Sequence, residues 1–134
     1  MKVVINTDGA SRGNPGLAGL GVYMSKEDGT PIGGFKKFIG EATNNVAEYR
    51  ALILGLDEAA NAGARQVEVR ADSELMIKQL TGVYKIKNAD MQTLAQIVRE
   101  KEKRFARVTY KHVPRAQNSV ADKLANEAID ERVP

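Results

Sequence analysis

The order in which strand and helix patterns follow one another constrains the fold of this chain more than any single motif. Three strand patterns come first, over residues 3–8, 19–25 and 32–40. The near-continuous apolar start of the first segment predicts a strand that is buried on both faces. The second and third segments flank residues 26–29, a turn-forming tetrapeptide, and therefore predict a hairpin.

Helical patterns then alternate with two further strand patterns. The most regular helical segment is 45–62, where Leu52 and Leu56 recur at helical spacing and Gly63 stands just past the expected end. The remaining expected elements are a strand over 66–71, helices over 73–80 and 89–103, a strand over 107–113 and a helix over 118–130.

This order, βββαβααβα, predicts an α/β fold in which a mixed sheet carries helices on its faces. Strands that are joined through helices should run parallel to the first strand, with right-handed crossovers. The 134 residues suit one hydrophobic core, and they contain no repeat, low-complexity run or long linker. We therefore expect a single domain over residues 1–134.

The residue types that the chain lacks limit the kinds of metal site that it can form. There is no cysteine, so neither disulfides nor a thiolate metal site can form. His112 is the only histidine, which argues against a zinc site built from several imidazoles. A metal bound by this chain must therefore be held by oxygen atoms, which favours Mg²⁺ or Mn²⁺.

Charge and hydropathy give a weaker indication of partners and location. Lys and Arg total 20 against 17 Asp and Glu, a net charge of +3 that is compatible with nucleic-acid binding without establishing it. No apolar run approaches the roughly 20 residues of a membrane span, and the N-terminus lacks a signal-peptide pattern. We expect a cytoplasmic monomer that has no membrane partner.

Two acidic residues stand at the ends of expected strands. Asp8 closes the first strand and Asp72 follows the strand over 66–71. In sheets with parallel strands, functional sites collect beyond the carboxyl ends of those strands. Both residues also have structural alternatives, because Asp8 precedes a glycine in a possible turn and Asp72 could cap the following helix.

Two more acidic residues lie in the first turns of expected helices. Glu48 is three residues after Asn45, a spacing that is typical of a capping box. Asp122 lies where the helix dipole favours a carboxylate. Four carboxylates gathered in one place would repel one another, and divalent cations would neutralise them. The residues alone leave the structural and the metal-binding interpretations open.

Four sequence blocks resemble those of type 1 ribonuclease H. They are residues 7–16, 42–49, 69–73 and 118–126, and each contains one of the four acids. The blocks follow in the order and spacing of that family over essentially the whole chain. The resemblance implies a five-stranded mixed sheet with helices on both faces.

The same resemblance implies a reaction. Two Mg²⁺ ions, with Mn²⁺ as a substitute, would be bound by Asp8, Glu48, Asp72 and Asp122. Asp8 would bridge both ions. The RNA strand of an RNA–DNA hybrid would be cut endonucleolytically, which leaves 5′-phosphate and 3′-hydroxyl ends.

Further residues acquire expected substrate contacts from their positions in the motifs. Selectivity for RNA requires contact with the 2′-hydroxyl. The residues expected at the minor groove of the hybrid are Asn14, Asn44, Asn45 and Glu48. Thr43 and Asn88 match positions that hold a phosphate of the DNA strand. For the asparagines, turn and cap roles are the alternative.

The sequence departs from the long form of the family between its second and third long helices. A basic protrusion that contains tryptophan is reduced to residues 84–88, and the chain has no tryptophan. Lys85 and Lys87 either contact the DNA strand or belong to a solvated loop. Some short-form relatives also cut double-stranded RNA, so this substrate stays open. Glu74 replaces a substrate-contacting glutamine, and we expect no such contact from it.

The sequence also leaves open which residue assists the metal ions in catalysis, the helper residue of the family. His112 stands ten residues before Asp122, the spacing of the helper histidine in the family. However, His112 continues the alternation of Val108 and Tyr110, which predicts that it ends a strand with its ring held by packing. Arg115, in the following loop, is the alternative helper.

Two other functions compete with hybrid cleavage. A binding module with an inactive site would gain nothing from four acids that face phosphate. A DNA junction resolvase or transposase domain of the same superfold would not need the asparagines that suit 2′-hydroxyl contact. The motif blocks therefore favour hybrid cleavage.

Overall fold

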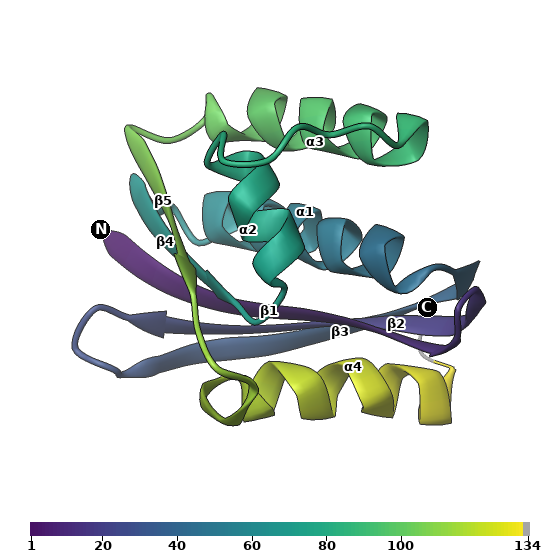
Figure 1. Ribbon diagram of the computed structural model, residues 1–134. Coiled ribbons are helices and arrows are strands. Elements are labelled where there is room, and N and C mark those ends of the chain that lie inside the picture. The colour runs from purple at the N-terminus through teal and green to yellow at the C-terminus, as the bar shows by residue number, and fades with distance from the viewer. Residues whose placement is uncertain (133–134) are drawn as a thin grey trace.

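A computed structural model describes residues 1–132 and contains a five-stranded sheet in the order β3-β2-β1-β4-β5. The strands are β1 (Lys2–Gly13), β2 (Gly16–Lys26), β3 (Pro31–Ala42), β4 (Gln66–Ala71) and β5 (Arg107–His112). The helices are α1 (Asn44–Asn61), α2 (Glu74–Leu80), α3 (Ala89–Glu102) and α4 (Ser119–Glu131), with a short 3₁₀ turn, η1 (Arg115–Gln117), before α4. Helices α1, α2 and α3 lie on one face of the sheet and α4 lies on the other (Figure 1). The predicted α/β fold with helices on both faces is confirmed.

Strand directions follow the prediction. β1, β2 and β3 form an antiparallel meander, whereas β4 is parallel to β1 and β5 is parallel to β4. The parallel register of β1 with β4 runs from Lys2 opposite Gln66 to Thr7 opposite Ala71. β1 therefore loses this neighbour immediately before Asp8, and β4 ends immediately before Asp72.

The first hairpin is longer than expected. β1 was predicted to end at Asp8, but its pairing with β2 continues until Gly13 lies opposite Gly16. Strand propensity is weak in this stretch, and cross-strand hydrogen bonding overrides it. Asp8 therefore lies inside a strand, at the point where that strand has a partner on one side only.

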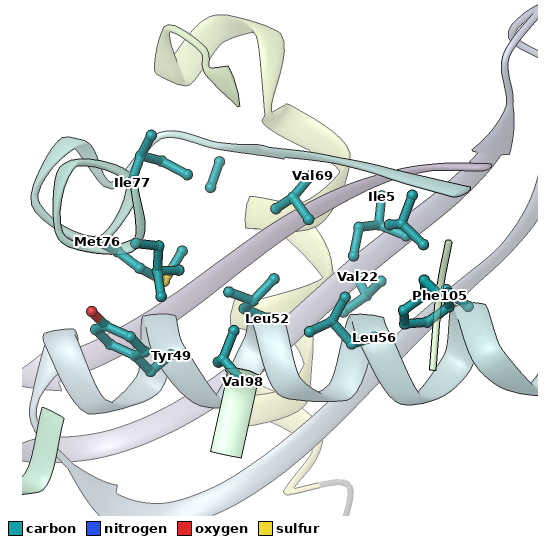
Figure 2. Packing of buried hydrophobic residues seen from close by; sticks show 14 of the residues in the cluster. Ile5, Val22, Tyr49, Leu52, Leu56, Val69, Met76, Ile77, Val98 and Phe105 are labelled. Atoms are coloured by element: carbon teal, nitrogen blue, oxygen red, sulfur yellow. The ribbon is translucent and has the colours of Figure 1, made fainter. Parts of the chain in front are cut away.

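The larger part of the core lies between the sheet and α1. Ile5 and Val69 of the sheet point toward Leu52 and Leu56 of α1 (Figure 2). All four side chains are fully buried. Burial of an aliphatic side chain of this size contributes about 1.5–3 kcal/mol, so this contact fixes α1 firmly against β1.

The opposite face has a thinner layer because α4 lies directly on the backbone of β2. A Cβ atom at Gly21 would lie 2.1 Å from the carbonyl oxygen of Ala121. Ala121 and Ala125 are fully buried there. Small residues on both sides thus bring the first turn of α4, which carries Asp122, close to the sheet.

β2 begins at Gly16, three residues before its predicted start, and the remaining element ends agree with the prediction to within two residues. α1 begins at Asn44 and ends before Gly63, which has the positive φ of 80° expected after a helix. η1 was not predicted. No helix in the part of the chain described here is long and apolar enough to cross a membrane.

Candidate metal and nucleic-acid site

The site begins where β1 contacts α1. A Cβ atom at Gly9 would lie 2.2 Å from the carbonyl carbon of Ala47 and 2.4 Å from the backbone nitrogen of Glu48. Only glycine permits this approach. The Gly9 backbone N–H donates a hydrogen bond to Oε1 of Glu48 over 2.6 Å. This contact brings Asp8, the neighbour of Gly9, beside Glu48.

Three carboxylates meet at this point. Oxygen atoms of Asp8, Glu48 and Asp72 all lie within 4.8 Å of one another. Asp8 and Glu48 are each only 6% exposed, and Asp72 is partly buried. Asp122 is outside this tightest group among residues 1–132, but it lines the same cavity of about 470 Å³.

The structural alternative for Glu48 is not realised. The side chain of Thr43 caps α1 by accepting a hydrogen bond from the Val46 backbone N–H over 3.2 Å. The expected capping box of Asn45 and Glu48 is therefore wrong, because the cap lies two residues earlier, at Thr43. Glu48 is left free to face the carboxylate cluster.

The alternative for Asp72 fails in the same way. Ser73 is the N-cap of α2, and its hydroxyl accepts a hydrogen bond from the Met76 backbone N–H over 3.3 Å. Asp72, one residue earlier, takes no part in this cap. Its side chain lies in the carboxylate cluster instead.

The cluster is electrostatically unfavourable without a cation. Burial raises the pKa of Asp8 far above its ordinary value, and the charges of Glu48 and Asp72 raise it further. Burial likewise raises the pKa of Glu48 to about 7, although the hydrogen bond from Gly9 opposes this shift. Desolvated carboxylate oxygens are the ligands that hard divalent cations prefer, so the donor set fits Mg²⁺ or Mn²⁺.

The expected minor-groove residues lie at the start of α1 and on the β1–β2 turn. Oδ1 of Asn14 accepts a hydrogen bond from the Asn44 backbone N–H over 3.1 Å. Asn44 lines the carboxylate cavity, and Asn45 is exposed beside it. Asn14 therefore has the turn role that was considered for it. The cap of α1 is formed by Thr43 rather than by Asn45, and the side chains of Asn44 and Asn45 are exposed to solvent.

The residues expected at the DNA strand lie outside the carboxylate cavity. Asn88 caps α3 by accepting a hydrogen bond from the Met91 backbone N–H over 3.1 Å. Lys85 and Lys87 are exposed in the segment between α2 and α3. In the same segment the ring of Tyr84 packs under the Lys78 ammonium, 5.0 Å from the ring centroid.

The two helper candidates are placed differently. His112 is the last residue of β5, as predicted, but it is exposed, so the expectation that packing holds its ring is wrong. It is not among the residues that line the carboxylate cavity within the described chain. Arg115 does line the cavity, and its Nη2 lies 3.7 Å from Oδ1 of Asp122.

Three residues at the site were not predicted as functional. Arg12 and Asn126 line the cavity, and Arg12 forms an ion pair of 2.6 Å with Asp130. Asn118 is buried against the cluster. All three residues stand inside the motif blocks, and this position was the only sequence feature that could have indicated a role for them. Spacing in the sequence could not show where their side chains point.

Glu74 also lines the cavity. Its carboxylate forms an ion pair of 2.6 Å with Lys78, which lowers the pKa of Glu74, and the nearby His112 lowers it slightly more. The Lys78 ammonium thus offsets the negative charge of Glu74, which stands where the long form of the family has a glutamine.

Comparison with known sequences shows a family match and several similar proteins. Residues 6–128 match a family described as reverse transcriptase-like. A protein named Ribonuclease HI from Halobacterium salinarum is 46% identical over 92% of this chain and 62% of its own length. A bifunctional protein of Mycobacterium tuberculosis is 48% identical over 97% of this chain. The chain spans only 36% of that mycobacterial protein.

Solved structures agree with this placement. The crystal structure of ribonuclease H1 from Halobacterium salinarum superposes with a TM-score of 0.96 at 44% identity, covering 98% of this chain and 99% of that one. LC11 ribonuclease H1, solved in complex with an RNA/DNA hybrid, gives 0.93 at 41% identity over 97% and 98% of the two chains. With its short connection between α2 and α3, the chain belongs to the reverse transcriptase-like family and, within it, to the short-form type 1 ribonucleases H.

Proposed function

We propose that this chain hydrolyses the RNA strand of RNA–DNA hybrids and leaves 5′-phosphate and 3′-hydroxyl ends. The observation that carries the proposal is the group of three carboxylates, two buried and one partly buried, within 4.8 Å of one another, with Asp122 on the same cavity wall. Family membership supports it, as does the hybrid-bound structure of LC11 ribonuclease H1.

The cofactor would be two Mg²⁺ ions, which Mn²⁺ could replace. Asp8, Glu48, Asp72 and Asp122 would hold them. When bound, such a pair of ions activates a water molecule and stabilises the leaving oxygen of a phosphodiester. Asp8 would be the residue best suited to share both ions, because the other three acids all lie close enough to raise the pKa of its carboxyl group.

Other groups of the chain would orient this machinery. The Gly9 backbone N–H fixes one oxygen of Glu48, which directs the carboxylate toward Asp8. Arg115 places a cation at the rim of the cavity beside Asp122, where it would contact the phosphate of the RNA strand. His112, at the end of β5, is the second and more distant helper candidate.

Substrate contacts would surround the start of α1. Asn14, Asn44 and Asn45 would face the minor groove and contact 2′-hydroxyl groups, together with Glu48. Thr43 and Asn88 stand at the N-termini of α1 and α3, where backbone N–H groups favour phosphate. Lys85 and Lys87 would add a weaker grip on the DNA strand.

Double-stranded RNA is a second candidate substrate. The segment that would contact a DNA strand, between α2 and α3, is short and contributes only Lys85 and Lys87 as exposed cations. A site with little contact to the second strand has little means of rejecting RNA there.

A panel of end-labelled duplexes tests the proposal. Hybrid, double-stranded RNA and double-stranded DNA are each incubated with Mg²⁺ or Mn²⁺, and the product ends are identified by mass spectrometry. We expect cleavage of the RNA strand in the hybrid and intact double-stranded DNA. Hybrid binding without cleavage would indicate a binding module, and cleavage of DNA junctions would indicate a resolvase.

A further inference from the structure

Asn118 is a buried polar residue to which the proposed reaction assigns no role. It follows η1 and directly precedes α4, and it is 1% exposed. Its position is the N-cap of α4, yet its side chain makes no capping hydrogen bond. Capping is left to its backbone carbonyl, which accepts from the Asp122 backbone N–H over 3.1 Å. The side chain is therefore available for contacts outside the helix.

Those contacts reach two other segments of the site. Nδ2 of Asn118 donates to the Thr7 carbonyl oxygen over 2.9 Å and to Oδ1 of Asp72 over 3.3 Å. Oδ1 of Asn118 accepts from Nδ2 of Asn6 over 3.2 Å. Thr7 is bonded directly to Asp8, so Asn118 contacts the segments that carry Asp8 and Asp72, and its backbone contacts Asp122.

The orientation of the amide follows from its partners. A carbonyl oxygen and a carboxylate oxygen can only accept, so the group that faces both must be the NH₂. The Asn6 amide, which donates to the opposite side, agrees with this assignment. No other uncharged side chain of similar size supplies two donors and an acceptor on one planar group.

We infer that Asn118 is a positioning residue that holds the segments of Asp8, Asp72 and Asp122 in the arrangement that binds the divalent ions. The inference rests on the proposed metal-dependent function. Each segment comes from a different element: β1, the end of β4 and the start of α4. Hydrogen bonds to the ligands of a metal site set the direction of the ligand oxygens.

Asn118→Ser removes both donor contacts but keeps a small polar residue before α4. Loss of such a supporting hydrogen bond typically lowers metal affinity or activity by about 10–100-fold. We expect the Mg²⁺ concentration for half-maximal hybrid cleavage to rise by about tenfold. At saturating Mg²⁺ the kcat should fall while the KM for the hybrid stays unchanged.

Gln79→Ala is the matched control. Gln79 is also a buried amide, 6% exposed, and it accepts a hydrogen bond of 2.6 Å from the Tyr49 hydroxyl. It lies outside the carboxylate cluster. Its loss should lower the thermal midpoint of unfolding as Asn118→Ser does, but leave the Mg²⁺ requirement as in the unmodified protein.

Two readouts do not depend on cleavage. Calorimetric titration of the substrate-free proteins with Mn²⁺ should give weaker binding to Asn118→Ser than to Gln79→Ala. In the unmodified protein, the side-chain amide NMR signal of Asn118 should shift during a Mg²⁺ titration, which needs no variant. If hybrid cleavage itself were absent, these two measurements would still test the role of Asn118.

Equal Mn²⁺ affinity in Asn118→Ser and Gln79→Ala, at equal loss of stability, would make Asn118 a merely structural residue. An Asn118 amide signal that ignores Mg²⁺ would overturn the inference as well.

Discussion

Replacing Gly9 with alanine would force the strand that carries Asp8 away from the helix that carries Glu48. The added Cβ would lie 2.2 Å from the Ala47 carbonyl carbon and 2.4 Å from the Glu48 backbone nitrogen. Both are backbone atoms of α1, so no side chain can rotate out of the way. An ordinary carbon contact begins at about 3.5 Å, and α1 or β1 must therefore move by more than about 1 Å.

The expected effect has two parts. Overpacking of this kind typically costs about 1–3 kcal/mol of stability. The shift also breaks the hydrogen bond from Gly9 to Glu48, and leaving a buried carboxylate oxygen unpaired costs roughly 1–3 kcal/mol more. A misplacement of about 1 Å among reacting groups can lower the rate about 100-fold, so activity should fall even in the molecules that remain folded.

The assay compares Gly9→Ala with Gly33→Ala, which changes a glycine in the same sheet. A Cβ at Gly33 would meet only the ring end of Phe35, at 3.3 Å, and this side chain can yield. Thermal unfolding and hybrid cleavage are measured for both. The reasoning would be refuted by a Gly9→Ala protein with the stability and turnover of Gly33→Ala.

The other predictions concern pH, the helper residues and the DNA strand. Because burial raises the pKa of Glu48 from 4.5 to about 7, the folded protein binds more protons than the unfolded chain between these values. Glu48 alone should lower the unfolding free energy of the metal-free protein by about 3 kcal/mol as the pH rises through this window, and the raised pKa of Asp8 should add to the fall. Urea titrations with EDTA and with Mg²⁺ should differ in this slope. His112→Ala should lose less than about tenfold in turnover, below the usual range of acid–base help, and Arg115→Ala at least as much. A hundredfold loss for His112→Ala alone would reverse this assignment. Replacing Lys85 and Lys87 with alanine should lower the salt-dependence slope of hybrid binding by about one per lost phosphate contact, and an unchanged slope would leave them in a solvated loop.

Local signals in the sequence were sufficient for the order and direction of the elements. Periodic apolar residues and the turn at 26–29 predicted all five strands and the four helices. The limits of β1 were not predictable in this way. Gly9 to Arg12 have weak strand propensity, and only pairing with β2 keeps them extended.

The choice between neighbouring cap residues was also beyond the sequence. Thr43 and Asn45 can both cap a helix, and a shift of two residues decides whether Glu48 bonds to the helix end or to Gly9. Because helix ends depend on tertiary contacts, the capping-box pattern was misleading here.

The candidate site was predictable as a set of acids but not as a geometry. Asp8 and Asp72 follow from strand ends, and the motif blocks supply Glu48 and Asp122. The contacts of Asn118 join segments more than 40 residues apart in sequence, and no local pattern encodes them. The exposure of the His112 ring could not be predicted either, because it depends on which elements cover the end of β5.

Cleavage of a labelled RNA–DNA hybrid in Mg²⁺ by the unmodified chain and by Asp8→Asn tests the central claim most directly. The asparagine keeps the shape of the side chain but removes the charge at the centre of the carboxylate group. We predict cleavage of the RNA strand by the unmodified chain. We predict none by Asp8→Asn, which should be folded and at least as stable without metal, because folding then no longer requires this carboxylate to be buried or protonated. Near-normal turnover by Asp8→Asn would contradict the metal-dependent account.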